Sequence, residues 1–265
     1  MALNSHEISR LARILDDGLL GARELPRITE EHSDLSLEDA YRIQDEGIAL
    51  RVSRGEKIIG YKMGLTSKAK QEQMNLRLPI YGVLTDRMRV AGGKFPLKGT
   101  IHPKIEPEIA FLISRDLSGK LSREEALQSI SAVFAAMEIL DSRFVGFKYF
   151  SLPDVVADNC SSSYFVSGEP VREFHSLNLS DLDMIMSING KTVQSAKSNA
   201  ILGDPVLSLI ALSEMLGARG LKLAAGSIVL AGAATVAVQL ETGMDVALQV
   251  TGLPEVKVSV ASASH

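Results

Sequence analysis

The chain has 265 residues, of which 46% are hydrophobic and 23% charged, and its formal net charge is −4. These values are typical of a globular protein with a substantial core, and they exclude extensive disorder. Because the sequence has no lysine- or arginine-rich block and no apolar run near the ~20 residues of a membrane span, we expect neither nucleic-acid binding nor membrane insertion.

The only cysteine is Cys160, which excludes an internal disulfide and a metal-thiolate cluster. The first residues lack a basic region followed by an apolar run, so no signal peptide is predicted. We therefore expect a cytoplasmic protein.

The first part of the chain is predicted to be helical. Apolar residues spaced by three and four predict an amphipathic helix over residues 5–17, closed by Gly18 and Gly21. A second helix is predicted to begin at Ser36, where Ser36-Leu37-Glu38-Asp39 approximates a capping box, and to end before Gly55. We divide the chain into a small helical N-terminal lobe over residues 1–75 and a β-rich catalytic core over residues 76–265.

Strand patterns dominate the core, and together with the helices they predict an α+β fold. The run at 132–141 favours a buried strand, although its periodicity also fits a helix. Asn189-Gly190 favours a hairpin with a type I′ turn. Strands are expected at 57–63, 79–84, 101–113, 227–240, 245–250 and 256–260, and the hairpin at 184–193, with a turn at Thr242-Gly243. Helices are expected at 67–73, from the capping box at Ser122 to 130, and from Asp204-Pro205 to 216.

Within the strand at 101–113, Glu106 and Glu108 share one face because alternate side chains of a strand point the same way. Their Cα atoms would be roughly 6.5–7 Å apart by strand rise. Two neighbouring carboxylates suit a hard divalent cation such as Mg²⁺ or Mn²⁺. The alternative is a solvated strand face with two surface glutamates.

Glu138 is the candidate third metal ligand, because it is an acid in an otherwise apolar run and an isolated buried carboxylate is costly. The alternatives are a buried salt bridge, for instance to Arg143, or an exposed position on a helix. Asp141, at the end of the run, is expected to cap a turn.

Lys62 follows Tyr61 in a strand bounded by glycines, where an ammonium group could polarise a substrate carbonyl or pair with a carboxylate, or simply face water. Lys104 has the same parity as the glutamates and could offset their charge or take part in catalysis. The polar residues 158–163 could line a pocket with amide and hydroxyl groups, or form an ordinary turn.

Several motifs occur in order along nearly the whole chain and resemble the hydratase/decarboxylase family of meta-cleavage aromatic degradation, which is related to the fumarylacetoacetate hydrolases. The forms of the first three motifs are most similar to family members that decarboxylate 2-oxo-3-hexenedioate. In chain order, the five motifs are Gly60-Tyr61-Lys62-Met63-Gly64-Leu65-Thr66-Ser67, Pro79-Ile80-Tyr81-Gly82, Ile101-His102-Pro103-Lys104-Ile105-Glu106-Pro107-Glu108-Ile109, Glu138-Ile139-Leu140-Asp141-Ser142-Arg143 and Val155-Val156-Ala157-Asp158-Asn159.

The resemblance implies a mixed β-roll core and a metal-dependent carboxy-lyase acting on a 2-oxo dicarboxylate, with hydration of 2-hydroxypenta-2,4-dienoate as the alternative reaction. It also implies a homo-oligomer and a complex with the hydratase of the same pathway. By the same resemblance Mg²⁺ or Mn²⁺ would be held by Glu106, Glu108 and Glu138, Lys62 would be catalytic, and Leu65, Thr66, Ser161 and Thr235 would bind substrate.

Two positions depart from the family pattern. Relatives commonly have Leu-Gly-His-Pro where this chain has Leu202-Gly203-Asp204-Pro205, so no histidine can be carried over there. Relatives often have Thr-Gly-Gly where this chain has Ala231-Gly232-Ala233, although Thr235 is retained. Both departures bear on substrate length and on the choice between decarboxylation and hydration.

Overall fold

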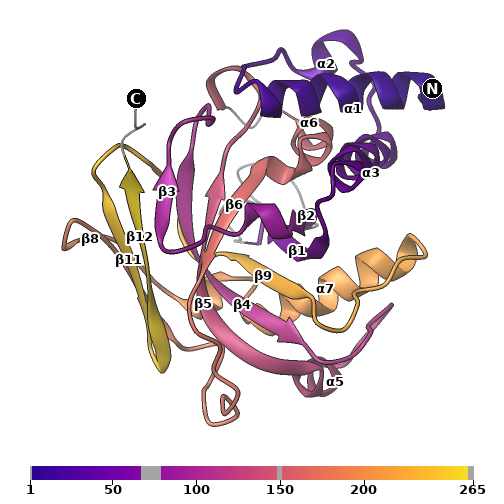
Figure 1. Ribbon diagram of the computed structural model, residues 1–265. Helices are drawn as coiled ribbons and strands as arrows, with labels where there is room; N and C mark the ends of the chain where they lie inside the picture. Colours follow the sequence, from indigo (N-terminus) through magenta and orange to yellow (C-terminus); the bar gives the residue numbers. More distant parts are fainter. Residues whose placement is uncertain (1, 67–78, 148–150, 262–265) are drawn as a thin grey trace.

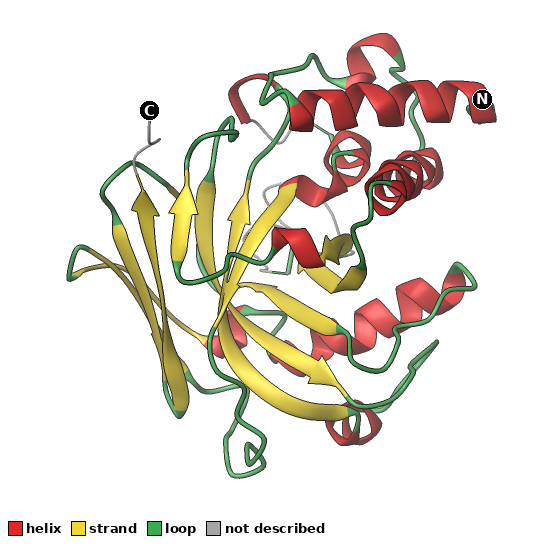
Figure 2. Ribbon diagram, viewed as in Figure 1, coloured by secondary structure: helices red, strands yellow, loops and turns green. Residues whose placement is uncertain are grey.

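The computed structural model describes residues 2–66, 79–147 and 151–261. Two β-sheets form the body of the molecule, and the N-terminal helices gather at one side of them, away from the smaller sheet (Figure 1). Figure 2 shows these N-terminal helices in red at the upper right, while α5 (Arg123–Gln128) and α7 (Pro205–Ala218) lie beside strands of the larger sheet. The α+β architecture expected from the sequence is confirmed.

The N-terminal helices begin and end close to the predicted residues. The Asn4 side chain caps α1 by accepting a hydrogen bond from Glu7 N, and Ser36 caps α3 by accepting one from Asp39 N. Helix α1 continues through the buried Gly18 and ends at Leu20, with Gly21 as its C-cap. The helices of this region are α1 (Ser5–Leu20), α2 (Ile28–Glu31), α3 (Leu37–Ser53) and, from later in the chain, α6 (Leu152–Ala157).

The larger sheet has seven strands and carries all the motif strands. Its order is β2-β1-β9-β4-β5-β6, and β10 pairs with the first residues of β4. The strand expected at 227–240 is two strands, β9 and β10, separated by residues 234–237. The bounds are β1 (Ile58–Gly64), β2 (Ile80–Thr85), β4 (Lys104–Ile113), β5 (Ile130–Leu140), β6 (Ser162–Ser167), β9 (Ile228–Ala233) and β10 (Val238–Gln239).

Strand β1 precedes the division that we placed at residue 75, yet it pairs with β2 and β9 inside the larger sheet. The helical part of the chain therefore ends before Ile58. The division itself and the helix expected at 67–73 lie outside the described residues, so a boundary at this point stays a prediction.

The smaller sheet has five strands in the order β3-β12-β11-β7-β8. The predicted hairpin joins β7 and β8, with φ of 50° at Asn189 and 76° at Gly190, as a type I′ turn requires. The strands are β3 (Lys94–Pro96), β7 (Asp183–Ile188), β8 (Lys191–Lys197), β11 (Asp245–Val250) and β12 (Leu253–Ala261).

The ambiguous run at 132–141 is a strand. It belongs to β5, which pairs with β4 on one side and β6 on the other and is buried on both faces, so its sequence shows no alternation. The capping box at Ser122 begins α5 (Arg123–Gln128), and Asp204 caps α7 (Pro205–Ala218).

Among the described residues, one helical stretch, Ser198–Ala218, is long and apolar enough to cross a membrane. Its α7 part spans only about 21 Å at 1.5 Å per residue, less than a ~30 Å hydrocarbon core. It packs beside β9, and Val206, Leu209, Leu212 and Leu216 are fully buried. We therefore assign it as a core helix.

Candidate metal centre

The carboxylates of Glu106, Glu108 and Glu138 meet on one face of the larger sheet. In the β4–β5 ladder Glu106 lies directly opposite Glu138, and Glu108 is two residues further along β4. Directly opposite residues share a face, so the register alone brings all three side chains together. One oxygen from each lies within 4.8 Å of the others, and this is the spacing of a group that could hold a metal ion.

All three side chains are buried, with at most 4% of their surface exposed. Burial, followed by the charges of Glu138 and Glu106, raises the pKa of Glu108 well above its ordinary value. Burial also raises the pKa of Glu138, although Lys62 acts against it. Glu108 Oε1 and Glu138 Oε1 have no hydrogen-bond partner in the described part of the chain. Buried carboxylate oxygens without donors are what a hard cation requires.

Lys62 is the cation that the described structure places against this group. Its Nζ lies 2.8 Å from Glu138 Oε2, and its side chain is 3% exposed. Burial disfavours the ammonium form, but the carboxylates of Glu138, Glu106 and Glu108 outweigh it and raise the pKa of Lys62. The alternative of a lysine facing water is wrong. Glu138 does form a buried salt bridge, but its partner is Lys62 and not Arg143, which pairs with Asp158. One ammonium faces three carboxyl groups, so a further cation could bind there and compensate their remaining negative charge.

Gly232, on β9, provides the backbone contact of this site. Its N–H donates to Glu108 Oε2 at 2.7 Å, and its φ of 107° lies in a region that favours glycine. A Cβ at this position would lie 2.2 Å from Thr66 Oγ1, so the Thr66 side chain packs directly against the glycine. The structure thus places Thr66 beside the glutamates, and Leu65, with φ of 56°, precedes it at the end of β1.

Replacing Gly232 with alanine is expected to destabilise the protein through both strain and overlap with Thr66. We expect Gly232→Ala to cost roughly 1–3 kcal/mol more than the matched change Gly243→Ala. Gly243 has φ of 83° but no atom within 4 Å of an added Cβ, so it reports strain alone. Chemical denaturation of both variants measures the difference, and equal costs would contradict the close packing of Thr66.

Residues 159–161 form a turn in which three consecutive non-glycine residues are left-handed. The φ values are 49° at Asn159, 54° at Cys160 and 58° at Ser161. Such residues are costly unless their surroundings hold them. Here Asn159 accepts from Val83 N and donates to Val83 O.

A buried ion pair supports the same turn. The Arg143 guanidinium contacts the Asp158 carboxylate, and the Ser142 and Ser161 hydroxyls donate to Asp158 Oδ2. The structure thus places Ser161 against Asp158, while the Ser162 hydroxyl lies near enough to Glu138 to help lower the pKa of that carboxyl.

Sequence reasoning missed Ser162 and Gly232 as contacts of the glutamates, and the left-handed turn. The one available signal was Asn159, since asparagine tolerates the left-handed region. Cys160 is a buried thiol and donates to Tyr81 O. Thr235 is half-buried and donates to Val236 O, so its contact with substrate stays a prediction. Asp141 accepts from Ile101 N and His102 N, which is the turn cap that we expected.

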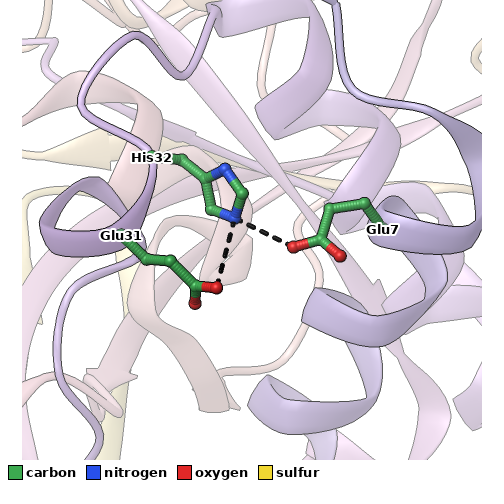
Figure 3. A group of neighbouring side chains, drawn as sticks. All are labelled: Glu7, Glu31 and His32. Carbon is green, nitrogen blue, oxygen red and sulfur yellow. Dashed lines mark hydrogen bonds and ion pairs between the residues drawn. The ribbon is translucent and has the colours of Figure 1, made fainter.

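A second group of neighbouring acids, Glu7 and Glu31 with His32, lies on the N-terminal helices (Figure 3). His32 Nε2 lies 2.9 Å from Glu7 Oε1 and 3.9 Å from Glu31 Oε1. Arg10 pairs with both glutamates, so a side-chain cation already compensates their charge. Unlike the buried glutamates, this group is a partly exposed ion-pair network.

The departure at Asp204 also has a structural role. Asp204 Oδ1 accepts from Val206 N at the start of α7, and its Oδ2 lies 2.7 Å from Arg123 Nε. A histidine at this position would carry no negative charge and could not form this ion pair with Arg123. Ala231 is fully buried in β9, next to Gly232.

Comparison with known proteins gives concordant results. The family model for the C-terminal part of fumarylacetoacetate (FAA) hydrolase matches residues 66–261. A 4-oxalocrotonate decarboxylase from a Pseudomonas species is 43% identical over 250 residues, which cover 93% of this chain and 95% of that protein. A 2-hydroxyhexa-2,4-dienoate hydratase from Comamonas testosteroni is 37% identical and covers 82% of this chain and 84% of that protein.

Among solved structures, 4-oxalocrotonate decarboxylase from Pseudomonas putida G7, complexed with magnesium and adipate, matches with a TM-score of 0.94. The two chains are 33% identical, and the match covers 98% of this chain and 99% of that one. The likeness therefore extends over the helical N-terminal region as well as both sheets.

Proposed function

Because the chain belongs to the fumarylacetoacetate hydrolase family, we propose that it is a divalent-metal-dependent carboxy-lyase that converts 2-oxo-3-hexenedioate (4-oxalocrotonate) to 2-hydroxypenta-2,4-dienoate and CO₂. The observation that supports this most is the buried trio of glutamates, with the Lys62 ammonium in ion-pair contact with Glu138. The decarboxylase relatives support the choice of substrate, since they match over nearly the whole chain.

We propose that Glu106, Glu108 and Glu138 hold the metal, Mg²⁺ or Mn²⁺. Carboxylate oxygens are the ligands that these hard cations prefer, and two of the oxygens present have no donor from the described residues. When bound, the cation supplies Lewis-acid stabilisation of the 2-oxo oxygen, which is typically worth several kcal/mol. With only three protein ligands, such a cation would remain able to bind the keto acid as well.

The reaction needs a place for negative charge to accumulate. When the C5–C6 bond breaks, C6 leaves as CO₂ and the electron pair of that bond forms C4=C5. The π pair of C3=C4 shifts to C2=C3, and the pair of the C2=O bond moves to the 2-oxo oxygen, which becomes anionic. A proton on that oxygen completes the dienol product. We propose that Lys62 is the catalytic residue that stabilises this charge, because it is a preorganised buried ammonium beside Glu138. Substrate contacts are assigned to Leu65, Thr66, Ser161 and Thr235.

Hydration of 2-hydroxypenta-2,4-dienoate is the second candidate. The 37% identity to a hydratase of a related dienoate favours this reaction. Both reactions act on a 2-oxo acid or its dienol form, so one scaffold can serve either.

The two candidates predict different products. With purified protein and Mg²⁺, 2-oxo-3-hexenedioate should release CO₂, and a chelator should abolish this release until Mg²⁺ or Mn²⁺ is returned. Formation of a 4-hydroxy-2-oxo acid from 2-hydroxypenta-2,4-dienoate, without CO₂ from the dicarboxylate, would favour the hydratase. Chelator-resistant turnover would contradict the metal assignment.

We also propose that the protein is cytoplasmic, forms a homo-oligomer and associates with the hydratase that consumes its product. A dienol product is reactive, and direct transfer to the next enzyme would limit its loss. Size-exclusion chromatography with light scattering, alone and with the hydratase, measures both associations.

A further inference from the structure

Lys104 lies on the same face of the sheet as the three glutamates. In the β4–β5 ladder Lys104 is opposite Leu140, and the next pair on that face is Glu106 with Glu138. On the other side Lys104 is opposite Gln239 of β10. The Cα atoms of Lys104 and Glu106 are therefore roughly 6.5–7 Å apart along the strand.

The ammonium of Lys104 has no anionic partner among residues 2–66, 79–147 and 151–261. Its Nζ lies 4.1 Å from the centroid of the Phe147 ring, and no described carboxylate lies within ion-pair distance. The side chain is partly buried. A partly desolvated cation with no counter-ion in the described part of the chain is costly to keep, and binding an anion would relieve that cost.

We propose that Lys104 binds the distal carboxylate of a dicarboxylate substrate and so selects dicarboxylic over monocarboxylic keto acids. This inference rests on the proposed function, which places the keto-acid end at the glutamates. A six-carbon chain that started there and ran along β4 toward its first residue would extend toward Lys104, which is one strand repeat from Glu106 on the same face. Phe147 packs against the ammonium and limits its hydration, which strengthens a charge-assisted hydrogen bond.

The chemistry gives this contact a distinctive kinetic signature. The distal carboxylate loses its charge when it leaves as CO₂, so its bond to Lys104 is stronger in the ground state than in the transition state. Removing such a bond should weaken binding without lowering the rate of the chemical step. Lys104 is therefore a specificity residue, in contrast to Lys62, which faces the charge that develops.

The experiment compares Lys104→Met with Lys104→Arg, which keeps the charge, and with Lys191→Met, an exposed lysine in the β7–β8 hairpin of the other sheet. Calorimetry of the Mg²⁺-loaded proteins measures the affinity for adipate and for hexanoate, its monocarboxylic counterpart. We expect Lys104→Met to lose about tenfold or more in adipate affinity, the size expected for one charge-assisted hydrogen bond, and to bind hexanoate unchanged. Lys104→Arg and Lys191→Met should retain the preference for adipate.

With the dicarboxylate as substrate, Lys104→Met should raise KM and leave kcat unchanged or higher. Equal losses for both acids, or unchanged adipate affinity, would overturn the proposal, since Lys104 would then only offset the glutamates. Wild-type protein that binds both acids equally, or neither, would overturn it as well. If the adipate preference depends on Lys104 but no CO₂ is released, the proposed reaction fails while the assignment of Lys104 stands.

Discussion

Glu108→Gln is expected to abolish metal-dependent activity and, at the same time, to stabilise the metal-free protein. Glutamine keeps the shape of the side chain, and its carbonyl oxygen can still accept the hydrogen bond from Gly232 N. What it removes is one of three buried carboxylates. We expect metal affinity to fall roughly 100-fold or more, since even indirect supports of a metal site are worth 10–100-fold.

The stabilisation should depend on pH, because the pKa of Glu108 is raised from an ordinary 4.5 by burial and by its neighbouring carboxylates. Above pH 4.5 the folded metal-free protein therefore binds more protons than the unfolded chain. Its stability falls as pH rises through the raised pKa. The variant lacks this group, so its advantage over the wild type should be absent below pH 4.5 and grow above it.

Thermal unfolding in chelator across pH, and metal titration by calorimetry, measure the two effects. Glu173→Gln is the matched control, because Glu173 is exposed and should change neither quantity. A variant that binds metal as the wild type does would exclude Glu108 as a ligand. A metal-free variant less stable than the wild type at every pH would mean that repulsion between the carboxylates does not destabilise the metal-free protein.

The sequence predicts the glutamate face well because a strand has a strict period of two. Glu106 and Glu108 had to share a face, and the buried position of Glu138 followed from its apolar neighbours. What the sequence does not contain is the register between β4 and β5, which sets Glu138 opposite Glu106 and depends on the whole ladder.

The partner of Lys62 could not be predicted for a similar reason. Lys62 and Glu138 lie on β1 and β5, with β9 and β4 between them. Their contact therefore depends on how the whole sheet is assembled, which the local sequence around either residue does not indicate. The alternative partner Arg143 is close to Glu138 in sequence but is held by Asp158 instead. Gly232 was noticed only as the retained glycine between two departures from a family motif, because a glycine in a strand does not indicate which side chain its N–H will contact.

Lys62→Met should lower kcat/KM by about 10²–10³, the usual loss when one preorganised stabilising donor is removed. Methionine keeps the length and the apolar contacts of the side chain, so the loss reports the charge. Without metal the same change leaves Glu138 buried without its ion-pair partner. Breaking a buried pair in this way costs roughly 3–5 kcal/mol.

The metal-free and metal-loaded forms of Lys62→Met should therefore behave differently. In chelator its melting temperature should fall well below that of the wild type, and saturating Mg²⁺ should recover most of the difference, because a bound cation compensates the carboxylates that Lys62 no longer faces. Activity should stay low even with metal saturated, since the metal restores charge balance at the glutamates but not the ammonium beside the substrate. The matched control is Lys57→Met, an exposed lysine just before β1. Recovery of both stability and activity on adding Mg²⁺ would mean that Lys62 is only a counter-ion of Glu138. Persistent inactivity in a fully stable, metal-loaded protein would support its direct action on the developing charge.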